Sequence, residues 1–311
     1  MEPILQIEHL SITFTQYSRG ARRRELPVIR DLSLSLSPGE VTAVVGASGS
    51  GKSLLAHAIL GLLPYNSRRE GSILYKGQEL TPRRLEKLRG REISLVPQGV
   101  TYLDPLMKVG PQLTQGRRDI DTRRRAQEAL SRYGLGPGTE RLYPFQLSGG
   151  MARRVLMASA VMESPQLIIA DEPTPGLDAQ AAGRLLGHFR ELAQEGAAVL
   201  FITHDLELAL TVAHRVAVFY AGETIEEALA SDFEAGSLRH PFTQALWDAL
   251  PQQGFRPIPG SQPYPGEVGE GCPFLGQCPH PGAGCAQGPL PLQPFQGGAV
   301  RCLYPNKEVA P

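Results

Sequence analysis

The chain has 311 residues, of which 41% are hydrophobic and 20% are charged. This length fits one large domain with an appendage, and this composition supports a sizeable core and excludes global disorder. Lys and Arg together number 31, as do Asp and Glu, so the formal net charge is +0 and we expect no nucleic-acid partner held by bulk positive charge. The first ten residues lack a basic start before an apolar block, and no later run is long enough to span a membrane. We therefore expect a chain that stays inside the cell and reaches a membrane only through a partner.

Hydropathy patterning in the first part of the chain predicts strands followed by one helix. Alternating apolar residues predict strands over 4–14 and 28–36, and the polar, Arg-rich residues 15–27 between them predict a loop. A continuous apolar run over 41–45 is typical of a strand that is buried on both faces, and helical spacing over 54–63 predicts a helix.

Strands and helices alternate over the rest of the first 250 residues. We expect strands over 71–76, 92–96, 167–170, 198–203 and 216–220, the last of these ending the sheet. Helices are expected within 105–165 and over 178–195 and 205–213. This alternation predicts an α/β fold with a mostly parallel sheet that is covered on both faces and interrupted by an inserted helical subdomain of about residues 100–165.

A glycine-rich turn lies between the predicted strand over 41–45 and the helix that follows. Residues 46–53 fit the phosphate-loop motif G-x-x-x-x-G-K-[ST], in which backbone N–H groups and the helix N-terminus face phosphate oxygens. Lys52 adds a charge for the β and γ phosphates, and the Ser53 hydroxyl is suited to bind Mg²⁺. The predicted nucleotide-binding residues of this loop are Gly46, Ser48, Gly49, Ser50, Gly51, Lys52 and Ser53.

The apolar run 167–170 ends in Asp171, and Glu172 follows directly. Ligands of parallel α/β sheets bind at the carboxyl ends of the strands, so Asp171 is predicted to lie beside the phosphate loop and to complete the Mg²⁺ shell. Glu172 is predicted to polarise a water for attack on the γ-phosphate. Alone, the pair of acidic residues would be interpreted as a solvated strand end; in combination with the phosphate loop the pattern favours the functional interpretation.

The tetrad L-S-G-G over 147–150 precedes a helical run, and Ser148 is predicted to cap that helix. The tetrad lies about twenty residues before the acidic strand and about a hundred after the phosphate loop. This order of motifs resembles the nucleotide-binding subunit of ABC transporters, over roughly residues 4–250. The resemblance implies a P-loop NTPase fold with an added antiparallel β subdomain, and ATP and Mg²⁺ as ligands.

The resemblance also implies roles for residues that have no motif of their own. Gln98 matches the glutamine that contacts Mg²⁺ and the attacking water, although the two residues after it depart from the family pattern. His204 matches the switch histidine on the γ-phosphate. Phe14 matches the aromatic residue that stacks on adenine, with Tyr17 as a competing candidate.

In this family, the phosphate loop of one chain faces the L-S-G-G tetrad of another chain across ATP. Ser148, Gly149, Gly150 and the D-loop residue Asp178 would then serve the partner's nucleotide, and this chain has one set of motifs. The implied partners are a second, homologous ABC ATPase subunit in a homo- or heterodimer, two transmembrane permease subunits and an extracytoplasmic solute-binding protein. The implied location is peripheral, at the cytoplasmic face of the cell membrane.

The Pro- and Gly-rich tail narrows the resemblance to the oligopeptide/dipeptide/nickel importer subfamily. Its cysteines, Cys272, Cys278, Cys285 and Cys302, are separated by 5, 6 and 16 residues. Four thiolates at this spacing are candidate ligands of a [4Fe–4S] cluster, which the subfamily resemblance allows. A Cys₄ zinc site and four free thiols are the alternatives, and the lack of a C-x₂-C pair weakens zinc.

The sequence therefore predicts an ABC nucleotide-binding domain over 1–250 and a cysteine-containing C-terminal extension over 251–311. The expected function is ATP hydrolysis that powers a bacterial importer of di- or oligopeptides, or of nickel or metal–metallophore complexes. A soluble ABC ATPase of repair or translation is the alternative. The chain lacks the sustained heptads of repair types and has one cassette, where translation types have two.

Overall fold

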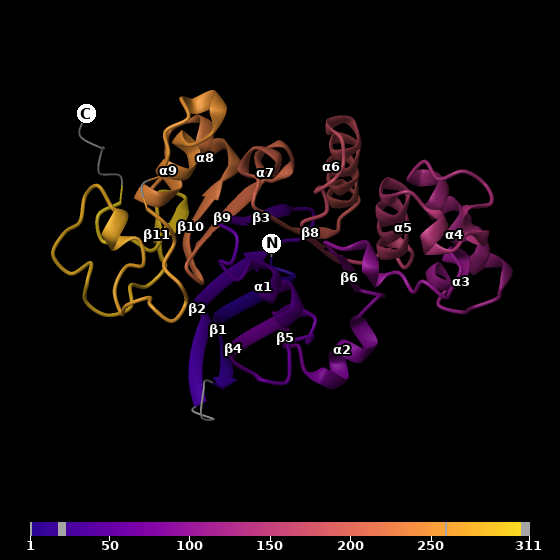
Figure 1. The fold of residues 1–311 in the computed structure, drawn as a ribbon, viewed down its shortest axis with the longest axis horizontal. Coiled ribbons are helices and arrows are strands. Elements are labelled where there is room, and N and C mark those ends of the chain that lie inside the picture. The colour runs from indigo at the N-terminus through magenta and orange to yellow at the C-terminus, as the bar shows by residue number, and fades with distance from the viewer. Residues whose placement is uncertain (1, 18–22, 259, 306–311) are drawn as a thin grey trace.

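The computed structural model describes residues 2–17, 23–258 and 260–305. These residues fold around two β-sheets (Figure 1). The larger sheet has the strand order β11-β12-β10-β9-β3-β8-β7-β6, and the smaller has the order β2-β1-β4-β5. The strands of the larger sheet are β3 (Val41–Gly46), β6 (Ile93–Val96), β7 (Leu167–Asp171), β8 (Ala198–Thr203), β9 (Arg215–Tyr220), β10 (Glu223–Leu229), β11 (Gln293–Phe295) and β12 (Gly298–Val300). Those of the smaller sheet are β1 (Leu5–Tyr17), β2 (Arg23–Leu36), β4 (Ser67–Tyr75) and β5 (Gln78–Glu79).

Helices cover the larger sheet on one face, and α1 with the smaller sheet covers the other, below it in Figure 1. The helices are α1 (Lys52–Ile59), α2 (Pro82–Leu88), α3 (Val109–Leu113), α4 (Ile120–Arg132), α5 (Gly149–Val161), α6 (Ala179–Gln194), α7 (Leu206–Val212), α8 (Ala230–Glu234) and α9 (Pro241–Asp248). Side chains of a strand alternate between its two faces. Val41, Ala43 and Val45 of β3 therefore join the core under α5 to α7, while Val44 joins the core under α1. The predicted α/β fold with a sheet covered on both faces is confirmed.

Five strands of the larger sheet, from β9 through β3, β8 and β7 to β6, run parallel to one another. Parallel strands end at the same edge, so the segments after β3, β7 and β8 meet there. At the other side of the sheet β10, β12 and β11 add antiparallel pairs. The mostly parallel sheet predicted from the sequence is thus present, with antiparallel pairs added by β10 and, from the C-terminal extension, by β12 and β11.

The loop predicted over 15–27 is wrong for the described part of that range. β1 continues to Tyr17 and pairs with β2, which begins at Arg23, through Phe14↔Leu26 and Thr15↔Glu25. The C-terminal end of β1 and the N-terminal end of β2 are largely exposed, so they show no alternating apolar face. Hydrogen bonds between the two strands keep this polar sequence extended. Residues 18–22 of the predicted loop lie outside the described residues.

The prediction that the strand over 216–220 ends the sheet is also wrong. β10 follows directly after β9, although its sequence ETIEEAL is rich in Glu. Glu226 is fully buried there because its carboxylate accepts the backbone N–H groups of Arg239 and His240, both at 2.8 Å. Long-range partners of this kind leave no trace in local hydropathy.

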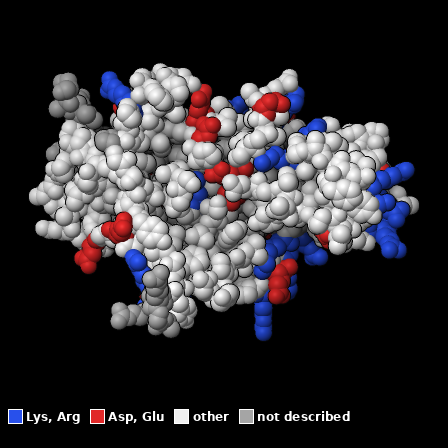
Figure 2. Space-filling model, viewed as in Figure 1, with Lys and Arg blue, Asp and Glu red and all other residues white. Residues whose placement is uncertain are grey.

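Three helices, α3, α4 and α5, form the end of the molecule at the right of Figure 1. Lys and Arg side chains gather at that end of the surface, as Figure 2 shows. Several basic side chains on and next to α4 are ion-paired: Arg117 and Arg125 with Glu163, and Arg124 with Asp121. None of the helices in the described residues combines the length and the apolar character needed to cross a bilayer.

Candidate functional site

The phosphate loop connects β3 to α1 at the carboxyl edge of the larger sheet. It begins at Gly46, where any Cβ would collide with the carbonyl oxygen of Phe219 on β9, so only glycine lets these strands pack. Gly49 has a φ of +81°, in the left-handed region that favours glycine. Within the described residues, the buried Ser50 hydroxyl has no hydrogen-bond partner. The loop thus has a fixed backbone and an unsatisfied donor.

Lys52 is the first residue of α1, and its side chain folds back over the loop. Its Nζ donates to the carbonyl oxygens of Gly46 and Ala47, both at 2.8 Å. Burial lowers the pKa of Lys52, and the carboxylates of Glu172 and Asp171 oppose this shift. The ammonium group therefore lies among the loop carbonyls and two acidic residues, in a position to contact a phosphate bound by the loop.

Ser53 and Asp171 face each other between α1 and the end of β7. The hydroxyl of Ser53 donates to Oδ1 of Asp171 at 3.1 Å. Burial raises the pKa of Asp171; the Ser53 hydrogen bond opposes this shift, and the charge of Glu172 adds to it. A hydroxyl and a buried carboxylate with an acidic neighbour are oxygen donors of the kind that Mg²⁺ prefers, so the residues present fit this ion.

Glu172 and His204 meet across the ends of β7 and β8. Nδ1 of His204 lies 3.0 Å from Oε1 of Glu172. Glu172 has a φ of +43°, which is uncommon for a residue other than glycine, and its backbone N–H donates to the carbonyl oxygen of Ile202 at 2.9 Å. Backbone strain of this kind concentrates at functional sites.

The signature tetrad lies apart from the chain's own phosphate loop. Ser148 caps α5, as predicted, by accepting the N–H of Met151 at 3.2 Å. Gly149 and Gly150 have open space where a Cβ would stand, and Gly150 lines a cavity of about 910 Å³ together with Asp178. Asp178 caps α6 by accepting the N–H of Ala181 at 2.8 Å.

Within the described residues, Gln98 and Phe14, two other predicted site residues, make no hydrogen bond to the Ser53–Asp171 pair. The side chain of Gln98 is exposed and makes no hydrogen bond to either residue within the described chain. Its carbonyl oxygen instead accepts from Arg153 of α5 at 3.3 Å. Phe14 is partly buried against the core of the smaller sheet, whereas Tyr17 is exposed.

Arg153 makes a connection that the sequence did not reveal. The same guanidinium nitrogen that contacts Gln98 also donates to the carbonyl oxygen of Pro173, one residue after Glu172, at 3.3 Å. Arg153 thus joins the signature helix to the segments after β6 and β7. Its position in α5, three residues after the tetrad, was the one local signal that could have pointed to this role.

The C-terminal extension reaches the phosphate loop. A cavity of about 350 Å³ is lined by residues 46–48, His204 and, from the extension, Gln262 and Gln277. Nε2 of Gln277 donates to the carbonyl oxygen of Ser261 at 2.6 Å, which ties two turns of the extension together beside the loop. Gln277 directly precedes Cys278, so the cysteine segment and the nucleotide site are neighbours.

All four cysteines line a second, small cavity of about 20 Å³ in the extension. Burial raises the pKa of Cys272 to about 11, and burial also raises the pKa values of Cys278 and Cys302. Over residues 2–17, 23–258 and 260–305, no three His, Cys, Asp or Glu side chains are arranged to hold a metal ion. The thiols are thus gathered without converging on one point.

His240 lines the same cavity from the start of α9. Its Nδ1 accepts the backbone N–H of Phe242 at 3.0 Å. Its Nε2 is buried and, in the part of the chain that the structure describes, has no hydrogen-bond partner. Complete burial lowers the pKa of His240 to about 3, so the ring is neutral at pH 7.

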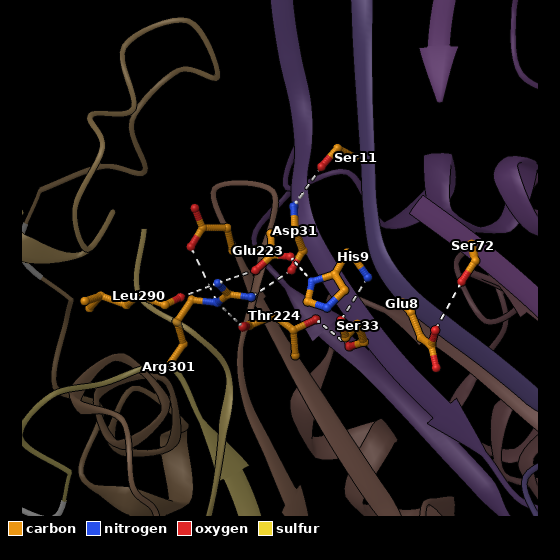
Figure 3. A network of polar contacts seen from close by, with 10 residues as sticks. All are labelled: Glu8, His9, Ser11, Asp31, Ser33, Ser72, Glu223, Thr224, Leu290 and Arg301. Atoms are coloured by element: carbon orange, nitrogen blue, oxygen red, sulfur yellow. Dashed lines mark hydrogen bonds and ion pairs between the residues drawn. The ribbon is translucent and has the colours of Figure 1, made fainter. Parts of the chain in front are cut away.

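Arg301, the residue before Cys302, fixes the extension to both sheets (Figure 3). Its guanidinium, 2% exposed, donates to the carboxylate and carbonyl oxygens of Asp31 at 3.0 and 2.7 Å and to the carbonyl oxygen of Thr224 at 3.0 Å. It also donates to the carbonyl oxygen of Leu290. Oδ1 of Asp31 in turn lies 2.6 Å from Nδ1 of His9. The segment that carries Cys302 is therefore anchored to β2 and β10.

Comparisons with known proteins agree with this arrangement. The family model described as ABC transporter matches residues 29–175, and that described as Oligopeptide/dipeptide transporter, C-terminal region, matches residues 225–285. Among curated relatives, the oligopeptide transport ATP-binding protein OppD of Escherichia coli is 34% identical, covering 99% of this chain and 95% of its own length. The dipeptide transport ATP-binding protein DppD of Bacillus subtilis is 35% identical, covering 90% of this chain and 88% of its own length.

Solved structures show the same fold. A dimeric ATP-binding cassette in a post-hydrolysis state, bound to ADP and Pi, has a TM-score of 0.63 at 27% identity, covering 73% of this chain and 98% of that one. The cbiO1 protein of Clostridium perfringens, part of an ABC transporter complex, has a TM-score of 0.62 at 26% identity, covering 76% and 92%. With relatives at 34% identity over nearly its whole length, the chain belongs to the ATP-binding subunits of ABC transporters, in the oligopeptide/dipeptide transporter family.

Proposed function

We propose that this ABC ATPase powers the import of di- or oligopeptides. One observation supports the ATPase chemistry. The ends of neighbouring strands bring together, beside one phosphate loop, Lys52, the Ser53–Asp171 pair and the Glu172–His204 pair. The cargo rests on the relatives, whose names specify oligopeptide and dipeptide transport.

Each residue of this site has a proposed role. Lys52 and the backbone N–H groups of the loop bind the phosphates. Ser53, Asp171 and Gln98 hold Mg²⁺, which when bound neutralises charge on the β and γ phosphate oxygens. Glu172 accepts the proton of the attacking water, and His204 holds Glu172 and contacts the γ-phosphate.

A second ABC ATPase subunit, homologous to this chain, completes the site in our proposal. Ser148 and Gly149 are exposed, and the two signature glycines have open space around them. Gly150 and Asp178 line a different cavity from residues 46–48 and His204. These residues are thus free to serve a nucleotide held by another chain, and a related cassette is dimeric.

We further propose that two permease subunits dock near Gln98, with a solute-binding protein outside the membrane, so that this chain lies at the cytoplasmic face. Large apolar side chains are exposed shortly after Gln98, among them Tyr102, Leu106 (88% exposed) and Met107. Phe145, before the signature, is exposed as well. Solvent-facing apolar groups in the segment after Gln98 and before the signature tetrad are suited to bury against a partner.

The four cysteines are proposed to hold a [4Fe–4S] cluster. Each iron of such a cluster takes its own thiolate, whereas zinc needs all four on one ion, and these thiols line one cavity without a common point. Because the cavity is only about 20 Å³, the surrounding Pro- and Gly-rich loops would have to move apart to receive the cluster. Iron and sulfide analysis of anaerobically purified protein tests this, and an iron-free, colourless sample would contradict it.

The division of the chain remains a proposal as well. We place the nucleotide-binding domain at 1–250, with its helical subdomain at about 100–165, and the extension at 251–311. The family matches at 29–175 and 225–285 support two units of this order.

Transport is tested by reconstituting the chain with the permeases and the solute-binding protein of a peptide importer. In proteoliposomes, we expect the binding protein loaded with a di- or oligopeptide to stimulate ATP hydrolysis and peptide uptake. Nickel, the other cargo predicted from the sequence, serves as the comparison. Stimulation by nickel alone would contradict the peptide assignment, and full activity without any permease would contradict the coupling to transport.

A further inference from the structure

The half-buried side chain of Arg153 leaves the group of helices to which its backbone belongs. Arg153 lies on α5, among the helices at the right of Figure 1. Its Nη1 atom has two N–H groups, and it donates to the carbonyl oxygens of Gln98 and Pro173, both at 3.3 Å. A Cβ added at Gly176 would lie 3.8 Å from Nη2 of the same guanidinium. One side chain of the signature helix thus lies against the segments that follow β6 and β7.

The partners of Arg153 are main-chain atoms. Among the described residues, its side chain donates to carbonyl oxygens and has no carboxylate at ion-pair distance. A hydrogen bond from a charged donor is stronger than one between neutral groups. Because a carbonyl group cannot rotate independently of its chain, these two bonds fix the path of the backbone after Gln98 and after Glu172.

The backbone at Glu172 requires such support. A residue that precedes proline favours extended conformations with a negative φ, yet Glu172 precedes Pro173 and has a φ of +43°. On one side, the N–H of Glu172 donates to the carbonyl oxygen of Ile202 on β8 at 2.9 Å. On the other side, Arg153 holds the carbonyl oxygen of Pro173. A strained conformation persists only where the surrounding structure determines it, and Arg153 supplies part of that structure from α5.

We propose that Arg153 is a positioning residue that ties the aim of the Glu172 carboxylate to the place of the signature helix. The inference rests on the ATPase function proposed above, in which Ser148 of this helix serves the nucleotide of a second subunit and Glu172 serves the nucleotide of its own chain. A displacement of α5 carries the guanidinium away from the carbonyl oxygens of Pro173 and Gln98. Binding of one nucleotide by the signature is thereby coupled to the readiness of the base at the other nucleotide.

The first test compares Arg153→Met with Arg184→Met in the full-length chain. Met keeps an unbranched apolar stem but donates no hydrogen bond. Arg184 of α6 is the matched control, since it is exposed, lines the same cavity of about 910 Å³ and has no hydrogen bond or ion pair within the described residues. Arg153→Met should lower kcat for ATP hydrolysis roughly 10-fold or more, as expected for the loss of hydrogen bonds from a charged group. Its affinity for a slowly hydrolysed ATP analogue and its denaturation midpoint should stay at the wild-type values.

Two further results of this comparison decide the outcome. Arg153→Lys keeps the charge and the N–H donors, so it should recover part of the lost rate. Equal rates in Arg153→Met and Arg184→Met overturn the inference, as does a loss of rate in Arg153→Met that weaker nucleotide binding accounts for in full.

A double variant tests whether Arg153 acts through the base. Residues that act as a unit have non-additive effects, so Arg153→Met should cause a smaller fold loss in a Glu172→Gln background than in wild type. Single-turnover hydrolysis of radiolabelled ATP measures these slow rates, and Arg153→Lys takes the place of Arg153→Met in the cycle where the latter does not fold. Equal fold losses in both backgrounds overturn the inference. Wild type that does not hydrolyse ATP, or Glu172→Gln with wild-type turnover, overturns the proposed function instead, so the two failures are distinguishable.

Discussion

Oε1 of Glu172 lies 3.0 Å from Nδ1 of His204, although α6 and β8 separate the two residues in the sequence. Parallel pairing of β7 with β8 places both residues at one edge of the sheet. The contact orients the carboxylate. The base role that we propose for Glu172 requires such an orientation, since the base must receive a proton from one particular water.

Replacing Glu172 by Gln should preserve ATP binding and abolish most hydrolysis. The amide keeps the size of the side chain but cannot accept the proton, so we expect turnover to fall about 10²- to 10⁴-fold. The variant should also accumulate as a nucleotide-bound dimer, measured by size exclusion with ATP. The control is Glu86→Gln, at an exposed position on α2. Unchanged hydrolysis in Glu172→Gln would refute the assignment of the base.

Replacing Lys52 by Ala should weaken nucleotide binding itself. In the proposed mechanism the ammonium group contacts phosphate before the reaction begins, and a charge-assisted hydrogen bond of about 1.5–3 kcal/mol corresponds to a loss of roughly 10- to 100-fold in affinity. Titration calorimetry with a slowly hydrolysed ATP analogue measures this loss. Lys87→Ala on α2 is the matched control, since Lys87 is exposed. Equal affinities for the two variants would contradict the role of Lys52.

Replacing Gly46 by Ala should destabilise the sheet more than replacing Gly49 by Ala. A methyl group at residue 46 meets the backbone of β9, which cannot yield easily, and overpacking of this kind costs about 3 kcal/mol. At Gly49 no atom lies within 4 Å of the added Cβ, so the variant bears only the strain of a positive φ, about 1–2 kcal/mol. Denaturant unfolding compares the two, and equal losses would disprove the steric argument.

The contact between Asp31 and Arg301 predicts a pH dependence of stability. Burial pushes the pKa of Asp31 up, but hydrogen bonds and charges from His9 and Arg301 outweigh it and leave the pKa below its ordinary value. A carboxylate with a lowered pKa in the folded state stabilises the fold above the unfolded-state pKa, and this contribution is lost as the pH falls through the folded-state pKa. Asp31→Asn should therefore be less stable than wild type at pH 7.

The difference between wild type and Asp31→Asn should shrink as the pH is lowered below about 4, near the unfolded-state pKa of Asp. Urea unfolding at a series of pH values measures it. Burial raises the pKa values of Glu226 and Glu227, and both titrate in the two proteins, so the comparison cancels most of their effect. A difference that grows on acidification would show that the pKa of Asp31 is raised instead.

The strands and helices at the carboxyl edge of the larger sheet could be predicted well because their signals are local. The phosphate loop is contiguous, and the strands over 167–170 and 198–203 are apolar runs whose parallel arrangement brings their ends together without further information. Ser148 was predicted as a helix cap from its position before a helical run, and the structure confirms it. Where an element depends on residues that are neighbours in the chain, the sequence pattern was sufficient to predict that element.

The C-terminal part was predicted poorly because its residues depend on distant partners. Arg301 is 270 residues away from Asp31, and Glu226 is buried only because the N–H groups of residues 239 and 240 cap its carboxylate. The length of β1 and β2 beyond residue 14 likewise comes from pairing between strands. The sequence near these residues gives no indication of such contacts.

The pairing of Glu226 with Val300 makes β12 the cover of β10. A protein cut short after residue 250 would present the backbone N–H and C=O groups of β10 to solvent, and an uncovered strand is a template for joining another molecule. Preparations of the cassette alone should therefore self-associate into aggregates, and solubility during purification would report on the extension before any assay of transport.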